Sequence, residues 1–345
     1  MSWVSLQGDY SGGATLGNLV NFVLMTLLSG TNTRYGLGGT DSFDYSITTI
    51  DQNVAAGQLV IIDAGQLLVG EDFTFNASAE TDGSYRLWGG QGTDVLTGGQ
   101  GSDFFFFSAD RFNTGDRIDG GGGTAMNQIS LLGDYTIALG ANQIANIQSL
   151  TFLSGRDLRN PTDFDYTITM HDNNLAPAVR MIVDAGQLKA TEKLDFDGSA
   201  ETNGTFWVLG GAGADVLKGG AGNDLIVGAA GADTMTGGAG NDVFRYNNVS
   251  DTLPNGGNDF ISDFGSGDRI DLSRIDANPN AHGDPAFSFI GSQAFTNQAG
   301  QLRVVNAFSN AWLVEGDIDG NGQADFQILL NTSDADPLTA ADFIL

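Results

Sequence analysis

Short runs of apolar residues alternate along the chain with turns rich in glycine, asparagine and aspartate. The clearest runs are Leu59–Ile62, Phe73–Phe75 and Tyr85–Trp88. No window shows the period of about 3.6 residues that marks an amphipathic helix. Short strands at even spacing are typical of all-β solenoids and barrels. The pattern therefore predicts an all-β solenoid.

The same pattern occurs twice. Residues 42–106 align without a gap with residues 163–227, at a constant offset of 121, and the strings FDY, DAGQL and SAET recur in register. SLQGDY at residues 5–10 also matches SLLGDY at residues 130–135, so the sequence begins inside a module. We expect the C-terminal part of a longer protein, or a chain with a shortened first module. The repeat predicts three domains: residues 1–125, 126–247 and 248–345.

Nonapeptides of one pattern, G-[GA]-x-G-x-D-x-U-x with U apolar, follow the apolar runs of each module. There are six copies, and the last four are strictly tandem. The middle residue of the short strand in each copy is predicted to point inward, because side chains alternate along a strand. These inward residues are Leu96, Phe105, Leu217, Ile226, Met235 and Phe244.

Two nonapeptides make one 18-residue turn of a two-sheet roll, so loops on one side stack at that spacing. The spacing separates Asp215 from Asp233, and Asp224 from Asp242. Stacked carboxylates and loop carbonyls form an oxygen cage of the kind that Ca²⁺ prefers, with bonds of about 2.3–2.6 Å, whereas Mg²⁺ fits poorly. Glycine permits the tight loop backbone. The predicted calcium site residues are Gly89, Gly92, Asp94, Gly98, Gly101, Asp103, Gly210, Gly213, Asp215, Gly219, Gly222, Asp224, Gly228, Gly231, Asp233, Gly237, Gly240, Asp242 and Asp259.

The first block of nonapeptides is predicted to bind fewer ions than the second. Asp94 and Asp103 fall on opposite edges, so their partners must come from degenerate turns. Residues 80–88 and 201–209 keep the nonapeptide register but lack its aspartate, and residues 119–127 resemble a loop that has lost it. The alternative, a metal-free array of turns, would leave stacked aspartates with nothing to offset their repulsion.

The charge of the chain favours cations and excludes two classes of anionic partner. Asp+Glu number 42 against 14 Lys+Arg, which gives a net charge of −28, and only five of the acids are glutamate. Aspartate suits turns and compact cation sites. Nucleic acid and anionic membranes would be repelled. There is no cysteine, and His171 and His282 lie in no HExxH string, which excludes thiolate metal sites and the zinc-protease motif.

The nonapeptides resemble the repeats of the RTX, or haemolysin-type, family. That resemblance implies a right-handed parallel β-roll that binds several Ca²⁺ ions. Residues 237–345 resemble the C-terminal domain of serralysin-type metalloproteases, in the strings GGNDFISDFGSGDRIDLS, LVEGDIDGNGQADFQILL and LTAADFIL. In that family the region is a β cap on the roll and carries a signal read by a type I (ABC) exporter. The ending Asp342-Phe343-Ile344-Leu345 fits such a signal.

The location expected from the resemblance is extracellular, with a structural or cell-surface role. The apolar run Phe22–Leu28 is too short and too late for a signal peptide or a membrane span. No nucleophile–base pair is visible, so we expect no enzymatic activity in these residues. Two alternatives remain open. One is the C-terminal region of a secreted hydrolase whose catalytic domain precedes Met1, and the other is an adhesin or glycan-binding module that uses residues 42–88 and 163–209.

Three further groups of residues have two interpretations. Asp317, Asp319, Asn321 and Asp325 mimic a calcium loop, but Ile328 replaces its last acid, and Asn-Gly between apolar runs favours a β-hairpin. The run Phe104–Phe107, with Trp88 and Trp207, is predicted to fill the core and cover the sheets rather than bind a ligand. Four aspartates after the last nonapeptide are candidates to close the last turn of the roll, and only the first is predicted to be a ligand: Asp259, Asp263, Asp268 and Asp271.

Overall fold

The computed structural model describes residues 2–17, 19–20, 22–33, 41–155, 162–254, 256–332 and 338–345. Within these residues the regular structure is β-strand, apart from four short 3-10 turns: η1 (Asp51–Asn53), η2 (Asp172–Asn174), η3 (Val249–Asp251) and η4 (Ala340–Asp342). The chain forms two compact units. Unit 1 comprises Met1–Gly155 and His171–Met181, and unit 2 comprises Arg156–Met170 and Ile182–Leu345.

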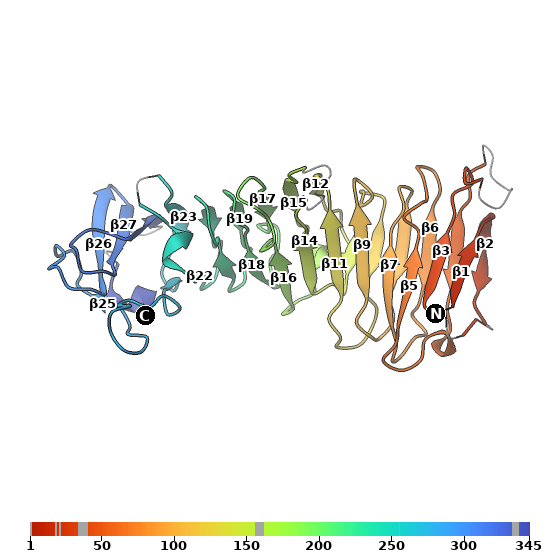
Figure 1. Cartoon of the computed structure of the whole chain (residues 1–345), viewed down its shortest axis with the longest axis horizontal. Helices are drawn as coiled ribbons and strands as arrows, with labels where there is room; N and C mark the ends of the chain where they lie inside the picture. The colour runs from red at the N-terminus through yellow and green to blue at the C-terminus, as the bar shows by residue number, and fades with distance from the viewer. Residues whose placement is uncertain are drawn as a thin grey trace. The chain divides into compact units, whose positions relative to one another are not determined.

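Unit 1 contains two parallel sheets, which run from red to yellow-green in Figure 1. The chain alternates between them, so each strand pairs with strands of the turns before and after it. One sheet contains β1 (Trp3–Leu6), β3 (Leu24–Leu27), β5 (Leu59–Asp63), β7 (Ser84–Trp88), β9 (Phe104–Ser108), β11 (Gln128–Leu132) and β14 (Ser149–Phe152). The other contains β2 (Tyr10–Thr15), β4 (Tyr45–Thr48), β6 (Phe73–Asn76), β8 (Asp94–Thr97), β10 (Arg117–Asp119) and β13 (Ile144–Ala145), and β12 (Tyr135–Ala138) lies between β11 and β13 in the chain.

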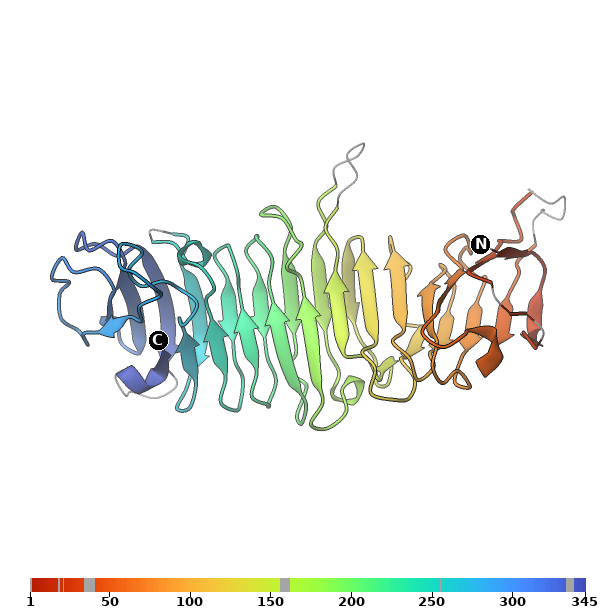
Figure 2. The ribbon, with the colours of Figure 1, turned by 60° about the horizontal axis from the view of Figure 1, so that its bottom comes forward.

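Unit 2 repeats this alternation, as the green to blue strands of Figure 2 show. One sheet contains β16 (Arg180–Asp184), β18 (Thr205–Leu209), β20 (Leu225–Val227), β22 (Val243–Arg245), β24 (Arg269–Asp271) and β29 (Phe343–Ile344). The other contains β15 (Tyr166–Thr169), β17 (Leu194–Asp197), β19 (Val216–Lys218), β21 (Thr234–Thr236), β23 (Asp259–Phe264), β28 (Phe326–Thr332), β27 (Ala311–Asp317), β26 (Gln301–Phe308) and β25 (Ser288–Phe289).

The core of each unit lies between its two sheets and follows from the alternation of side chains along the strands. All six predicted inward residues of the nonapeptides are buried, with exposed fractions of at most 1%. Aromatic rings fill the wider turns of unit 1, where Phe75 and Tyr85 meet edge to face at 5.1 Å between centroids. The predicted all-β fold, a parallel β-roll, is therefore confirmed.

The C-terminal part of unit 2 extends one sheet with antiparallel strands. β27 pairs with β28 from Gly316 opposite Phe326 to Ala311 opposite Asn331, which confirms the predicted hairpin. Residues 318–325 connect its two strands, a longer connection than a two-residue Asn-Gly turn. β28 also pairs in parallel with β23, so the antiparallel strands continue one sheet of the roll beyond β23. β29, at the C-terminus, pairs in parallel with β24 and is the last strand of the other sheet.

Candidate metal centre

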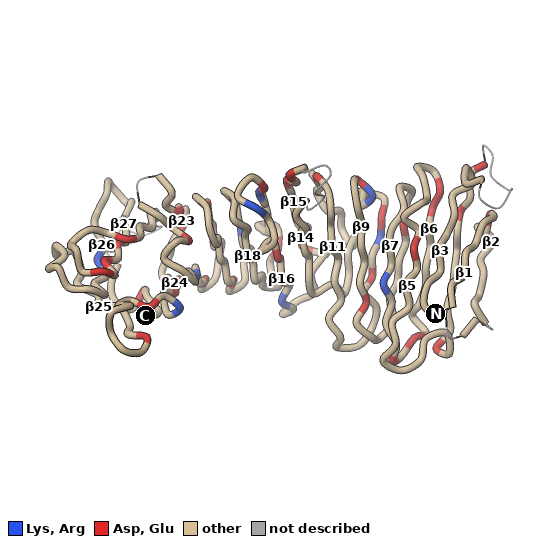
Figure 3. Tube along the Cα trace, viewed as in Figure 1, with Lys and Arg blue, Asp and Glu red and all other residues tan. Residues whose placement is uncertain are grey.

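The aspartates of all six nonapeptide loops are buried at the start of short strands. Their exposed fractions are at most 2%, although aspartate is rarely buried without a partner. Asp94 and Asp103 precede core residues of different sheets, as the sequence predicted. Figure 3 shows how acidic residues recur along the chain while basic residues are few.

Hydrogen bonds link the aspartates of unit 2 into two columns. In the first column the amide of Asp215 donates to Oδ1 of Asp233 at 2.9 Å, and the amide of Asp233 donates to Oδ1 of Asp259 at 2.9 Å. In the second, the amide of Asp224 donates to Oδ1 of Asp242 at 2.8 Å. The amide of Asp242 then donates to Oδ1 of Asp268, also at 2.8 Å. The predicted stacking at 18 residues is therefore present.

The second carboxylate oxygen divides the loops into two kinds. In four loops this oxygen accepts a hydrogen bond from the glycine amide at the second position of the same loop. The carboxylate thus pairs with a backbone N–H group of its own turn. We call these the closed loops. Their bonds run from Gly90 to Asp94 (2.9 Å), Gly99 to Asp103 (2.7 Å), Gly211 to Asp215 (2.6 Å) and Gly220 to Asp224 (2.7 Å).

The loops at residues 228–233 and 237–242 lack this bond, and we call them the open loops. Oδ2 of Asp233 and Oδ2 of Asp242 are buried and have no hydrogen-bond partner. Oδ2 of Asp259 is also buried and makes no hydrogen bond of good geometry, although the Tyr246 hydroxyl lies close enough to lower the pKa of Asp259. The backbone differs accordingly: φ is +67° at Ala229 and +97° at Gly238, the second position of each loop. An unpaired buried carboxylate oxygen is costly, so these three atoms require a cation or a proton.

The pKa values of these carboxylates also indicate that they require a cation or a proton. Burial, followed by the charge of Asp259, raises the pKa of Asp233 to about 9. Burial raises the pKa of Asp259 to about 8 and that of Asp242 to about 7. None of the three forms an ion pair with a lysine or arginine among the described residues. A divalent cation would supply the missing positive charge.

The surroundings of the open loops contain other oxygen donors. The carbonyl oxygens of Gly213 and Gly220 lie where a Cβ on Gly231 or Gly238 would stand, so only glycine fits these close approaches between stacked turns. Carboxylate and carbonyl oxygens without nitrogen or sulfur suit a hard cation, and a site of variable geometry suits Ca²⁺ better than Mg²⁺. The residues present therefore fit calcium, which when bound would neutralise Asp233, Asp242 and Asp259.

The first block is completed by residues outside the nonapeptide pattern. The amide of Asp94 donates to Oδ1 of Asp116 at 2.9 Å. The amide of Asp103 donates to Oδ1 of Asn127 at 2.9 Å, and the Asn127 side chain donates to the carbonyl of Asn146 at 3.0 Å. Asn127 thus takes the place of an aspartate in the degenerate loop at 119–127, a role that the sequence did not predict. Only Oδ1 of Asp94 is left without a partner among the four carboxylate oxygens of Asp94 and Asp103.

Four of the five glutamates are buried in the turns that precede the two blocks. Each is at most 2% exposed and accepts backbone amides of its own turn. Glu80, for example, accepts from Gly83 at 2.8 Å, and Glu201 accepts from Gly204 at 2.7 Å. Each of these carboxylates therefore caps the turn in which it lies. The four are Glu71, Glu80, Glu192 and Glu201.

The aspartates after the last nonapeptide have roles that the sequence showed only in part. Asp259 and Asp268 each continue a column at a spacing of 26 rather than 18 residues. The longer spacing arises because residues 246–254 add a connection with one 3-10 turn between β22 and β23. Asp263 accepts the amides of Gly237 and Gly238, both at 2.9 Å. Asp116 was not predicted, and Asp268 was predicted only as a residue that could close the last turn, because neither follows a Gly-Gly-x-Gly string.

The hairpin loop at residues 318–325 gathers three carboxylates, those of Asp317, Asp319 and Asp325, within 4.8 Å of one another. Asp317 accepts the amides of Gly320 (2.7 Å) and Gly322 (2.9 Å), and Asp325 accepts the amide of Ile318 (2.6 Å). These bonds show that Asp317 and Asp325 stabilise the connecting turn of the hairpin, so they need no bound ion to explain them.

Comparison with known proteins supports the repeat assignment. The family model described as RTX calcium-binding nonapeptide repeat (4 copies) matches residues 82–111 and 209–244. These ranges contain both blocks of loops, so the chain carries RTX calcium-binding repeats. No curated protein matches the chain. In the part of the chain that the structure describes, no helix has the length and apolar character needed to cross a membrane.

Proposed function

We propose that this chain is a secreted calcium-binding β-roll protein that leaves the cell unfolded through a type I (ABC) exporter and folds outside on binding Ca²⁺. The observation that carries calcium binding is the set of buried, unpartnered carboxylate oxygens at Asp233, Asp242 and Asp259. The role is structural or at the cell surface, and the proposal assigns no enzymatic activity to these residues.

Composition supports folding outside the cell. A net charge of −28 repels itself, and 50 glycines lose much conformational entropy on folding. Where calcium is scarce, as in the cytosol, the columns of aspartates would have no cation. Metal binding energy then becomes folding energy, so calcium outside the cell would complete the roll after export.

A calcium titration followed by circular dichroism tests the calcium step. We expect a cooperative rise in β-sheet signal at pH 8 that excess chelator reverses. Mg²⁺ at the same concentration is the control and should produce a much smaller rise, because it dehydrates reluctantly. A spectrum that calcium leaves unchanged would overturn the proposal.

Export is tested by expressing the chain together with a type I exporter. We expect the full chain in the medium, and a variant without residues 338–345 to remain in the cells. Deletion of residues 2–9 removes the same number of residues from the other end and should leave export intact. If both deletions are exported alike, the C-terminal signal is not where we place it.

A further inference from the structure

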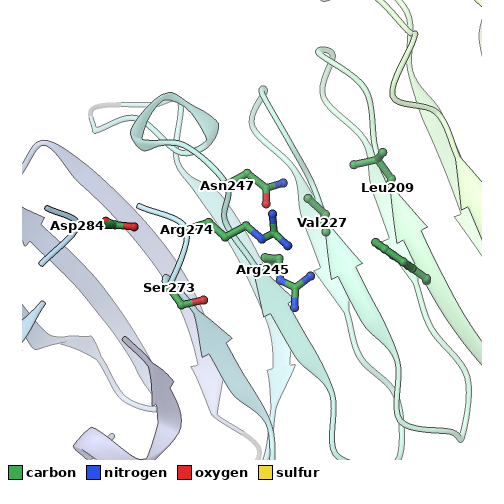
Figure 4. Close-up of a pocket in the computed structure, with 8 residues that line it drawn as sticks. Leu209, Val227, Arg245, Asn247, Ser273, Arg274 and Asp284 are labelled. Carbon is green, nitrogen blue, oxygen red and sulfur yellow. The ribbon is translucent and has the colours of Figure 1, made fainter. Parts of the chain in front are cut away.

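A pocket lies on the outer face of one sheet of unit 2, away from the aspartate columns. Its volume is about 680 Å³, and β18, β20 and β22 form its floor. Figure 4 shows its side chains, which come from these strands and from the segments after β22 and β24. The lining residues used below are Trp207, Leu209, Val227, Arg245, Asn247 and Arg274.

Two guanidinium groups converge on this pocket in a chain that has few cations. Arg245, Arg274 and Asn247 all line the pocket, and Figure 4 draws their side chains. Arg274 is exposed and forms no ion pair among the described residues. The lining also includes the carboxylate of Asp284, so the charged side chains that line the pocket are two cations and one anion. This excess of positive charge favours an anionic ligand.

An ion pair with Asp271 fixes the position of the Arg245 side chain. Its Nε donates to Oδ2 of Asp271 at 2.7 Å, and the hydroxyl of Ser273 donates to Oδ1 of Asp271 at 2.6 Å. Burial alone would raise the pKa of Asp271, but the bonds from Ser273 and Arg245 outweigh it and lower the pKa. Asp271 thus stays ionised and fixes Arg245, while the terminal nitrogens of Arg245 have no partner among the described residues. A planar fork presented in this way suits a carboxylate.

The other wall of the pocket is apolar. Trp207 is 38% exposed, a large value for an indole on a sheet face, and Leu209 and Val227 lie beside it. The sequence predicted Trp207 to fill the core or cover the sheet, yet its ring is left open to a ligand. An aromatic face packs against the C–H face of a sugar ring, and an apolar wall with a few polar groups is the usual make-up of a ligand site.

The duplicated module in unit 1 offers an internal comparison. At the offset of 121, Trp207, Leu209 and Val227 correspond to Arg86, Trp88 and Phe106. The Trp88 and Phe106 rings pack at 4.1 Å between centroids, and Arg86 lies over the Phe104 ring at 5.7 Å. In unit 1 the side chains on this face therefore pack against one another. In unit 2 the ring of Trp207 and the guanidinium groups of the pocket are instead at least partly exposed to solvent and can contact a ligand.

We propose that this pocket binds a carboxylate-bearing sugar of an acidic glycan. The guanidinium groups of Arg245 and Arg274 bind the carboxylate, Asn247 bonds a ring hydroxyl, and Trp207 stacks on the ring. This site is separate from the aspartate columns, so its failure and the failure of calcium-dependent folding would be distinguishable.

Isothermal titration calorimetry of the calcium-loaded full chain with trigalacturonate tests the proposal. We expect binding of trigalacturonate, no binding of the neutral sugar maltotriose, and affinity that falls with added salt. Arg274→Gln should weaken binding about tenfold, as the loss of one charge-assisted pair implies. Trp207→Ala should weaken it as well.

The matched control is Arg117→Gln, which removes one positive charge from unit 1, where the guanidinium bonds only backbone carbonyls. It should bind as the unaltered chain does. Circular dichroism with calcium checks that every variant is folded. The proposal is overturned by equal affinity of Arg274→Gln and Arg117→Gln, by equal binding of maltotriose, by failure of trigalacturonate to bind, or by sulfate competing as strongly as the sugar.

Discussion

Aspartate at the sixth position of the nonapeptide has two different surroundings in this chain. In a closed loop Oδ2 accepts an amide of its own loop, and at Asp224 both oxygens accept backbone amides, from Phe206 and Gly220 at 2.6 and 2.7 Å. In an open loop one oxygen is left without a partner, as at Asp233. The same residue therefore acts as a turn cap in one place and as a candidate ligand in another.

Ala229 provides the first test at this scale, because it has a φ of +67° where the other open loop has glycine. An L-residue in this conformation costs about 1–2 kcal/mol. Ala229→Gly should therefore raise the Tm of the calcium-loaded chain by several degrees. Ala221→Gly, at an exposed third position without positive φ, should lower Tm slightly because glycine adds entropy to the unfolded chain. A rise of equal size in both variants would contradict the assignment of strain to Ala229.

Asp233→Asn tests the unpartnered oxygen itself. The amide still accepts from Asp215 but has no charge, so the chelated protein should become more stable and the calcium-loaded protein less stable. The rise in Tm that calcium produces should then shrink, with a loss of about 1–3 kcal/mol in the calcium-dependent stability. Asp195→Asn, on the outer face of β17, removes the same charge and should leave the calcium effect unchanged. Equal effects would mean that Asp233 does not contribute to a calcium site.

At the scale of strands and loops, much of the roll could be predicted from the sequence and part could not. The nonapeptide is a local pattern, so it located the six loops and the inward residues such as Leu217 and Phe244. Asp116 and Asn127 lie in turns without that pattern, and their roles depend on which turns stack, a long-range property. The closed and open conformations also escaped prediction, because both kinds of loop have the same Gly-x-Asp string.

The loops also determine how stability depends on pH. The pKa values of Asp233, Asp259 and Asp242 in the fold without cation, about 9, 8 and 7, exceed the value of about 3.9 for an unfolded aspartate. Protons therefore bind the folded chain more tightly than the unfolded chain. The stability that they add to the fold is fully present below about pH 4 and is lost as pH rises through 7 to 9. In chelator, Tm should fall between pH 5 and pH 9.

Calcium should reverse this trend by replacing the protons, so the gain in Tm that calcium produces should increase from pH 5 to pH 9. Thermal unfolding at several pH values, with calcium and with excess chelator, measures both curves. A calcium gain that is largest at pH 5 would contradict the assignment.

At the scale of the whole molecule, the two units differ in how they satisfy buried acids. Both units use buried glutamates at turns, and unit 1 adds Asn127. Among the described residues, unit 1 has two buried carboxylate oxygens without a partner, at Glu80 and Asp94, whereas unit 2 has four, at Glu201, Asp233, Asp242 and Asp259. Unit 2, which contains both open loops, therefore has the greater need for a cation.

Hydrogen exchange of the full chain in chelator should reveal this difference. We expect β20–β23 of unit 2 to lose protection, while β5–β9 of unit 1 keep more of theirs, and added calcium to restore unit 2. Mass spectrometry of peptides from the two regions measures the contrast within one sample, so each unit is the control for the other. Simultaneous loss of protection in both would show that the units depend on calcium equally.

The parallel register of unit 2, in which Val216 pairs with Thr234 and Leu225 with Val243, has a consequence for how such a chain can evolve. Each pair is separated by one turn of 18 residues, and each turn contacts only the turns next to it. Duplication or loss of one such stretch of coding sequence would change the copy number of turns without altering any surviving contact. Recombination between the near-identical repeats can therefore lengthen or shorten the protein in whole turns, and related chains should differ in length by multiples of that unit.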